Sequence, residues 1–122
     1  MFIDNTILSH IKDKEYMIQN VRMERYTGQK IHIKTSVEDK NYLVLMYLEP
    51  NEYYKNNQKN NQNSNNMNLD NEILIYYYSA LYNEYNCLAN IIPENNTKKN
   101  IIKIKNILKN YHDFFPELKT LF

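Results

Sequence analysis

The chain has 122 residues, which matches one domain by the usual domain size of about 100–200 residues. Its 15 basic residues nearly balance its 14 acidic ones, and a net charge of +1 creates no global field that would draw it to nucleic acid or to an anionic membrane. A hydrophobic content of 43%, with 12 Tyr and 4 Phe, excludes a chain that is disordered throughout. We therefore expect a single domain over residues 1–122.

Cysteine usage and the N-terminal sequence indicate an intracellular protein, either cytoplasmic or nuclear. Cys87 is the only cysteine, so no internal disulfide can form, and a reducing compartment is the simplest interpretation. The N-terminus lacks the basic segment and apolar run of a secretory signal peptide. The longest nearly apolar stretches, Tyr42 to Leu48 and Ile73 to Tyr82, are shorter than the roughly 20 residues of a membrane-spanning helix, so we expect no transmembrane segment.

The first predicted element is a helix from about Asp4 to Asn20. Its apolar residues fall within one arc of a helical wheel, namely Ile7, Leu8, Ile11, Ile18 and Val21. The end of this helix is less well marked, because the alternating pattern within Met17 to Tyr26 could already be a strand. We place the change of structure near Asn20.

Two strands are predicted after this helix. Gly28 is the only glycine, and it lies in Thr27 to Lys30, which we interpret as a tight turn. Apolar and polar residues then alternate from Ile31 to Val37, the pattern of a strand with one buried face. A polar connection over Glu38 to Asn41 leads to Tyr42 to Leu48, which is apolar on both faces and is ended by a proline. Together these segments predict a small antiparallel hairpin or meander.

An asparagine-rich run divides the sequence. From Asn56 to Asn68, ten of thirteen residues are Asn or Gln, and they have almost no apolar surface to bury. We predict a flexible insertion at about 52–69 that separates a strand-rich first half from a helix-rich second half. Compositional drift is our interpretation of the run, and a sticky, assembly-prone tract is the alternative.

A long helix is predicted from about Asn71 to Ile91. On a helical wheel its polar residues form one narrow stripe, consisting of Ser79, Asn83, Asn86 and Asn90, and nearly everything else is apolar. The alternative is a short strand from Ile73 to Tyr78, because a run of three tyrosines suits a strand by propensity.

The last predicted helix runs from about Thr97 to Asp113. Its apolar residues recur at spacings of three and four, at Ile101, Ile104, Leu108, Tyr111 and Phe115, and Pro116 stops it. The expected fold is therefore an α+β domain with an N-terminal helix, a small antiparallel sheet, the Asn-rich loop, and two C-terminal helices packed on the sheet.

The strongest charge feature is a group of lysines on this last helix, which avoid its apolar stripe. They are candidate phosphate contacts: Lys98, Lys99, Lys103, Lys105 and Lys109. The alternative is an ordinary solvated helix face. The sequence contains only two arginines, Arg22 and Arg25, and both lie outside this helix.

Clustered tyrosines are candidate contacts for a partner, because a phenol combines apolar area with one polar tip. The candidates are Tyr76, Tyr77, Tyr82 and Tyr85. A cluster exposed at the surface would mark a protein interface, where tyrosine is enriched. The alternative is that they are core and rim residues.

Motifs for catalysis, metals and cofactors are not recognised in this sequence. The three histidines show no metal-ligand spacing, and one glycine cannot form a phosphate-binding loop or a nucleophile elbow. We therefore predict no cofactor and a non-catalytic role, as a protein–protein interaction module or small subunit of an intracellular assembly that binds a protein partner or a second copy. The alternatives are a nucleic-acid-binding protein that uses the lysine face, and a small enzyme whose site combines dispersed residues such as His32, Glu84 and Cys87.

Overall fold

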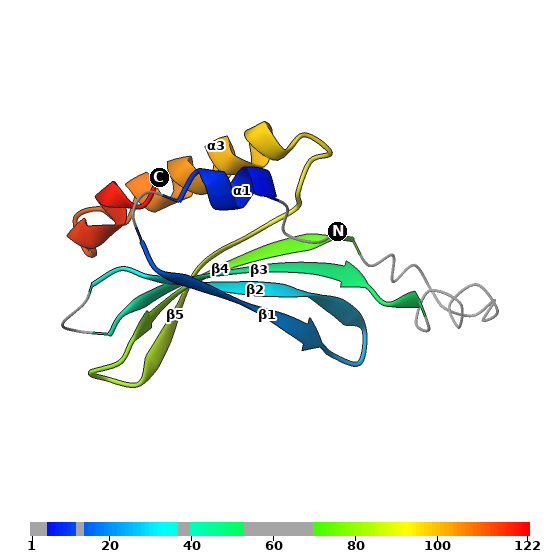
Figure 1. The fold of residues 1–122 in the computed structure, drawn as a ribbon, viewed down its shortest axis with the longest axis horizontal. Helices are drawn as coiled ribbons and strands as arrows, with labels where there is room; N and C mark the ends of the chain where they lie inside the picture. The colour runs from blue at the N-terminus through cyan, green and yellow to red at the C-terminus, as the bar shows by residue number, and fades with distance from the viewer. Residues whose placement is uncertain (1–4, 12–13, 37–39, 53–69) are drawn as a thin grey trace.

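The fold is a five-stranded antiparallel sheet with helices on one face (Figure 1). The structure is a computed structural model, and it describes residues 5–11, 14–36, 40–52 and 70–122. Its strands are β1 (Tyr16–Arg22), β2 (Tyr26–Lys34), β3 (Tyr42–Pro50), β4 (Glu72–Ser79) and β5 (Glu84–Ile91). Its helical elements are α1 (Asn5–Ser9), α3 (Thr97–Lys109) and the 3-10 helix η1 (Pro116–Thr120).

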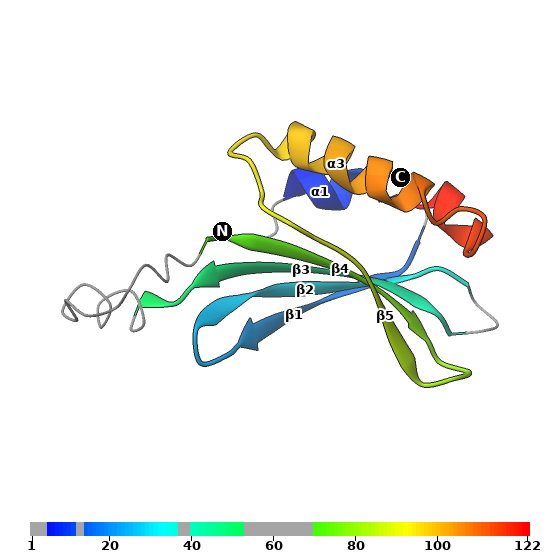
Figure 2. The same ribbon diagram turned by 180° about the vertical axis from the view of Figure 1, so that it is seen from behind.

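The sheet is a simple meander, because its strand order is β1-β2-β3-β4-β5. Helices α1 and α3 lie side by side over the same face of the sheet, and the view from behind shows the same arrangement (Figure 2). The opposite face carries no helix from the described part of the chain. None of the helices that the structure describes combines the length and the apolar character needed to cross a membrane.

The hydrophobic core lies between the sheet and the helices. Alternate residues of the three central strands point toward the helix layer and are fully or almost fully buried: Ile31, Ile33, Leu43, Leu45, Tyr47, Ile73, Ile75 and Tyr77. From the other side α3 contributes Ile101, Ile104 and Leu108. Burying one such aliphatic side chain stabilises a fold by roughly 1.5–3 kcal/mol, so this layer holds the sheet and α3 together.

Two asparagines fix the start of α3. Asn96 caps the helix, because its side-chain oxygen accepts a hydrogen bond from the backbone N–H of Lys98 (2.9 Å). Asn100 is 2% exposed, and its amide both donates to the Glu94 carbonyl (2.9 Å) and accepts from the Glu94 N–H (2.7 Å). The expected last helix is therefore present, but it ends at Lys109, before the expected Asp113.

The predicted N-terminal helix is wrong over most of its length. Helix α1 has only five residues, and the second half of the expected helix is strand β1. In β1 each residue opposes one of β2, from Tyr16 opposite Ile33 to Arg22 opposite Thr27. The helical spacing of the apolar residues was a coincidence, because Ile and Val also favour strands and β2 supplies a pairing partner that the wheel cannot show.

The predicted tight turn at Thr27 to Lys30 is also wrong, because these residues lie inside β2. Gly28 has no positive φ, so conformational freedom does not explain it. A Cβ built on Gly28 would lie 1.7 Å from the backbone carbonyl oxygen of Tyr47 on β3. Gly28 therefore permits close approach of two strands and does not form a turn.

The long helix predicted from Asn71 to Ile91 is wrong, and its alternative, a strand at Ile73 to Tyr78, is correct. The segment forms the β4–β5 hairpin, with Asn83 in its turn at a φ of 47°. Asparagine tolerates this left-handed conformation better than most residues. The polar stripe on the wheel has no structural counterpart, since pairing of β4 with β3 overrides the helical spacing.

The Asn-rich run, Asn56 to Asn68, and the strand end expected at Val37 lie outside the described residues. The structure nonetheless describes the end of β3 and the start of β4. Leu48 opposes Glu72 in the ladder, so the insertion connects two neighbouring antiparallel strands.

Candidate interaction surface

The sheet face opposite the helices carries a row of tyrosines across three strands. Lys34 opposes Tyr42, Tyr42 opposes Tyr78, and Tyr78 opposes Tyr85. The Tyr42 and Tyr78 ring centroids are 6.3 Å apart at an interplanar angle of 30°, and those of Tyr78 and Tyr85 are 4.6 Å apart at 37°. Cross-strand aromatic pairs stabilise a sheet, and here they also form one wall of a surface hollow.

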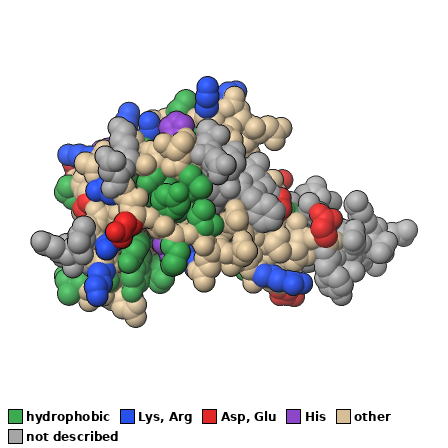
Figure 3. All heavy atoms as spheres, in the orientation of Figure 1, with side chains coloured by type: hydrophobic (Ala, Val, Ile, Leu, Met, Phe, Trp, Pro, Cys, Tyr) green, Lys and Arg blue, Asp and Glu red, His purple; other side chains and the backbone are tan. Residues whose placement is uncertain are grey.

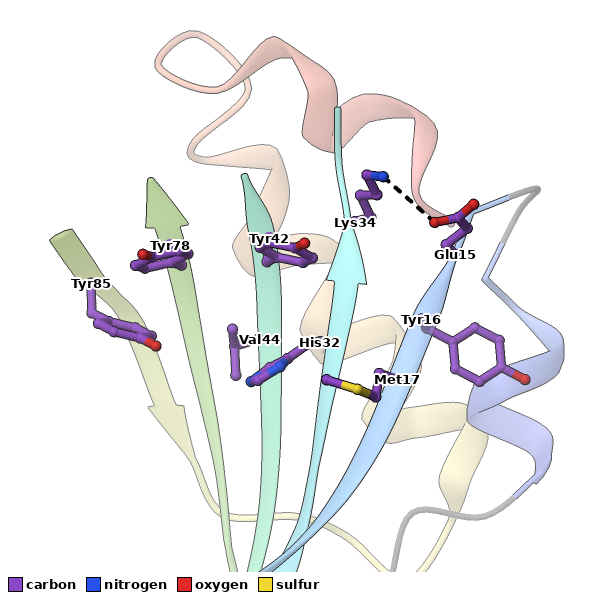
Figure 4. A pocket seen from close by; sticks show the side chains of 9 residues that line it. All are labelled: Glu15, Tyr16, Met17, His32, Lys34, Tyr42, Val44, Tyr78 and Tyr85. Atoms are coloured by element: carbon purple, nitrogen blue, oxygen red, sulfur yellow. Dashed lines mark ion pairs between the residues drawn. The ribbon is translucent and has the colours of Figure 1, made fainter. Parts of the chain in front are cut away.

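The hollow has a volume of about 430 Å³ and opens on this face (Figure 4). Val44 of β3 and His32 of β2 lie across from the tyrosine row, and Met17 of β1 extends over β2 toward His32. The His32 and Tyr42 rings have centroids 6.2 Å apart. The hollow therefore reaches from β5 to the edge strand β1, and aromatic and apolar side chains form much of its surface.

His32 is the polar group set into this hollow. Its Nε2 atom is buried and has no hydrogen-bond partner among the residues that the structure describes. Burial lowers the pKa of His32 from its ordinary value, and the nearby positive charge of Lys30 lowers it further. The imidazole is thus held toward its neutral form.

An ion pair lies at the rim of the hollow beside β1. Lys34 Nζ is 3.6 Å from Glu15 Oε2, and the Glu15 side chain is 85% exposed (Figure 4). Such exposed pairs contribute about 0–1 kcal/mol, so this one adds little to the stability of the fold. Its position matters more, because it borders the free edge of the sheet.

In the β1–β2 ladder, every second residue of β1 directs its backbone N–H and C=O groups away from β2. In an antiparallel ladder, opposed residues alternate between pairs that exchange both backbone hydrogen bonds and pairs that exchange none. The Lys34 N–H donates to the Glu15 carbonyl (2.9 Å), and the Met23 N–H donates to the Tyr26 carbonyl (2.8 Å). Between these two pairs, the residues whose N–H and C=O groups face the free edge are Tyr16, Ile18, Asn20 and Arg22.

This edge lacks most of the features that protect sheet edges against pairing with another strand, and Arg22 is the only charged residue of β1. No described residue forms a hydrogen bond to its outward backbone groups. The strand contains no proline, lysine or bulge, and its register with β2 is continuous. Three large apolar side chains are exposed along it: Tyr16 at 45%, Met17 at 59% and Ile18 at 39%.

The structure separates the predicted interaction tyrosines. Tyr85 lines the hollow, and half-buried Tyr76 lies on the same face, opposite Cys87. Tyr82 is exposed in the β4–β5 turn, next to exposed Leu81, where Figure 3 shows hydrophobic side chains gathered at this end of the molecule.

Tyr77 belongs to the core and not to this surface. Its ring stacks on Phe115 at 4.1 Å, and its hydroxyl donates to the Glu117 carboxylate. Sequence reasoning did not select Tyr42 or His32 for this surface. The available signal was the strand alternation, which places Tyr42 and Val44 opposite the buried Leu43 and Leu45.

The predicted lysine face lies on α3. Of the five lysines on α3, Lys103 is paired with Glu94 (3.6 Å) and also donates to the Ile92 carbonyl.

In the dispersed enzyme site, His32 and Cys87 lie in one cross-strand row. Val44 and Tyr76 lie between them, so the structure does not bring them together. The described residues contain no group of three or more His, Cys, Asp or Glu side chains that could hold a metal ion.

Comparisons with protein-family models, with curated proteins and with solved structures found no significant match to this chain.

Proposed function

We propose that the protein is a non-catalytic interaction module that binds an extended segment of a partner protein by strand addition to β1. The unprotected edge of β1 is the observation that supports this proposal. Its outward N–H and C=O groups are arranged to pair with another strand, which is how peptides join an exposed sheet edge.

The side chains beside this edge favour a partner segment with apolar residues. Met17 and Ile18 lie on opposite faces of β1, and both are exposed. A strand added here would cover apolar surface on each face, and burial contributes roughly 25 cal/mol per Å² of apolar surface. The hollow begins at Met17, so a long side chain of the added strand would lie next to it.

Selection of binders from a displayed peptide library tests the proposal. The selected peptide would be titrated into the isotopically labelled protein, and backbone amide shifts would be followed by NMR. The largest shifts are expected along Tyr16–Arg22. Shifts confined to another element, or selection of no peptide, would contradict strand addition at β1.

Two substitutions of Asn20 separate the backbone contact from the side-chain contact. Asn20→Pro removes an N–H that faces the free edge and is not used in the β1–β2 ladder, so the sheet should be retained while peptide binding is lost. Asn20→Ala removes only the side chain, which accepts a hydrogen bond from Gln29 (3.3 Å), and should bind peptide nearly as well as the parent protein. Equal binding by both variants would exclude this edge.

The alternative occupant of the edge is a second copy of the chain. Sedimentation velocity over a range of concentrations distinguishes the two cases. A dimer that Asn20→Pro dissociates would assign the edge to self-association, whereas a monomer at all concentrations leaves it free for a partner peptide.

A further inference from the structure

A second hollow lies on the helix layer, away from the β1 edge, between α3 and the C-terminal segment that includes η1. Its volume is about 400 Å³. Leu108 and Leu118, each 2% exposed, contribute apolar surface to it, and the half-buried Phe122 adds more. A volume of roughly 300–1,000 Å³ is usual for sites that hold small molecules.

Basic side chains surround this apolar surface. They are Lys105, Lys109, His112 and Lys119. Lys105 and Lys109 are four residues apart and so lie on the same side of α3, and packing of η1 beside α3 adds Lys119. Two of the five lysines predicted to contact phosphate are thus joined here by basic residues that the sequence pattern did not group with them.

The three lysines of this hollow lack an ion-pair partner among the described residues. Lys103, in contrast, is paired with Glu94. The carboxylate of Glu117, the nearest acidic residue to Lys119 in sequence, accepts a hydrogen bond from Tyr77. Like charges four residues apart destabilise a helix slightly, so helix stability does not explain the arrangement.

We propose that this basic hollow binds a small phosphate monoester with an apolar body. Lysine ammonium groups bind phosphate as point charges, and the two negative charges of a monoester match several ammonium groups better than one carboxylate does. The buried leucines and Phe122 provide the surface for the apolar body. This site is independent of the proposed β1 edge, because the two share no residue.

NMR titration with three probes tests the match between ligand and hollow. Hexyl phosphate carries both features, inorganic phosphate lacks the apolar body, and hexanoate has a similar body with a single charge. Hexyl phosphate should bind most tightly and shift amides of α3 and η1. Equal affinity for hexyl phosphate and inorganic phosphate, or shifts outside these elements, would overturn the proposal.

Matched lysine variants separate a local site from diffuse electrostatic attraction. Lys105→Gln, Lys109→Gln and Lys119→Gln should each weaken hexyl phosphate binding about tenfold. Lys98→Gln and Lys99→Gln remove the same charge from exposed positions near the start of the same helix and should change binding less than about twofold. Equal losses in the two groups would overturn the proposal.

Two further probes identify the source of the phosphate. Co-sedimentation with phosphatidic acid vesicles that depends on Lys105 and Lys109 would identify a lipid headgroup, and binding of hexyl phosphate without vesicle binding would identify a soluble ester. Both results support the hollow as a phosphate site. An oligonucleotide that binds more tightly than hexyl phosphate and loses affinity equally in all lysine variants would replace it with a nucleic-acid surface.

Discussion

The two edges of the sheet differ in how far they are protected. On β5 the ladder is interrupted by a bulge opposite Ile75 and Tyr76, and the backbone carbonyl of Leu88 already accepts a hydrogen bond from the Tyr111 hydroxyl (3.0 Å). The Lys103 side chain donates to the carbonyl of Ile92, just beyond β5. On β1, alternate backbone groups face outward without a partner among the described residues.

This difference concerns the features that protect a sheet edge against unwanted pairing. Sheet proteins protect their edges with bulges, charges, proline or covering side chains, because a regular free edge recruits other strands. Here β5 has a bulge and a carbonyl that accepts a side-chain hydrogen bond, whereas β1 has neither and carries a single charged residue, Arg22. The asymmetry supports β1 as the edge that is kept open for binding.

The largest expected effect comes from forcing β2 and β3 apart, because β1 joins the sheet by pairing with β2. Gly28→Ala places a methyl group where a Cβ lies 1.7 Å from the Tyr47 carbonyl oxygen, so the backbone must move. We expect a loss of about 3 kcal/mol or more in the free energy of unfolding. Urea denaturation followed by circular dichroism measures it. A stability within about 0.5 kcal/mol of the parent protein would show that the strands separate freely at this point.

A smaller effect is expected from removing the protection of β5. Tyr111→Phe deletes the hydroxyl that donates to the Leu88 carbonyl, at a cost of about 1 kcal/mol. Amide hydrogen exchange should accelerate along β5 and remain unchanged along β1. Equal acceleration of amide exchange along β1 and β5 would show that Tyr111 stabilises the whole core and not the β5 edge.

Shortening the connection between β3 and β4 should affect neither edge. Deleting Asn56 to Asn68 leaves enough chain to join β3 to β4, whose ends are neighbours in the ladder. Because loop closure depends weakly on loop length, stability should change by less than about 1 kcal/mol. Peptide binding at β1 should be retained. Loss of binding by a folded deletion variant would instead give the Asn-rich run a functional role.

A further small effect concerns pH and the hollow beside β1. The pKa of His32 is lowered in the folded protein, chiefly by burial, so the unfolded chain binds a proton more readily. Above the ordinary imidazole pKa of about 6.5, His32 should leave the free energy of unfolding independent of pH. Below that pH the free energy of unfolding should decrease, because the unfolded chain takes up the proton first. Urea denaturation of the parent protein and of His32→Gln, compared between neutral and mildly acidic pH, should show a weaker pH dependence in the variant. An equal pH dependence of stability in the parent protein and in His32→Gln would contradict this role of His32.

The sequence was sufficient where one segment carries its own signal. Tyr42 to Leu48 is apolar on both faces because it lies centrally in the sheet, and the spacing of Ile101, Ile104 and Leu108 follows the buried side of α3. Strands β1, β4 and β5 depend on partners elsewhere in the chain. Their apolar residues happened to repeat at helical spacing, so the wheel gave the wrong structure.

The candidate site also depends on the assembled sheet. Tyr85 was selected from a local cluster of tyrosines, but Tyr42 and His32 reach the hollow only through the register of β2, β3 and β4. A free edge is likewise a property of the assembled sheet. No local pattern in Tyr16–Arg22 distinguishes an edge strand from a central one.

The meander order has a consequence for how the chain folds. Every strand pairs with its neighbour in sequence, so hairpins can form from local contacts, and local contacts generally allow fast folding. The β3–β4 pair is the exception, because the long connection from Asn51 to Asn71 must close before these strands meet. We therefore expect the central pairing, between the two most buried strands, to limit the folding rate. Until it forms, the inner edges of β3 and β4 are as open to other chains as β1 is in the finished protein.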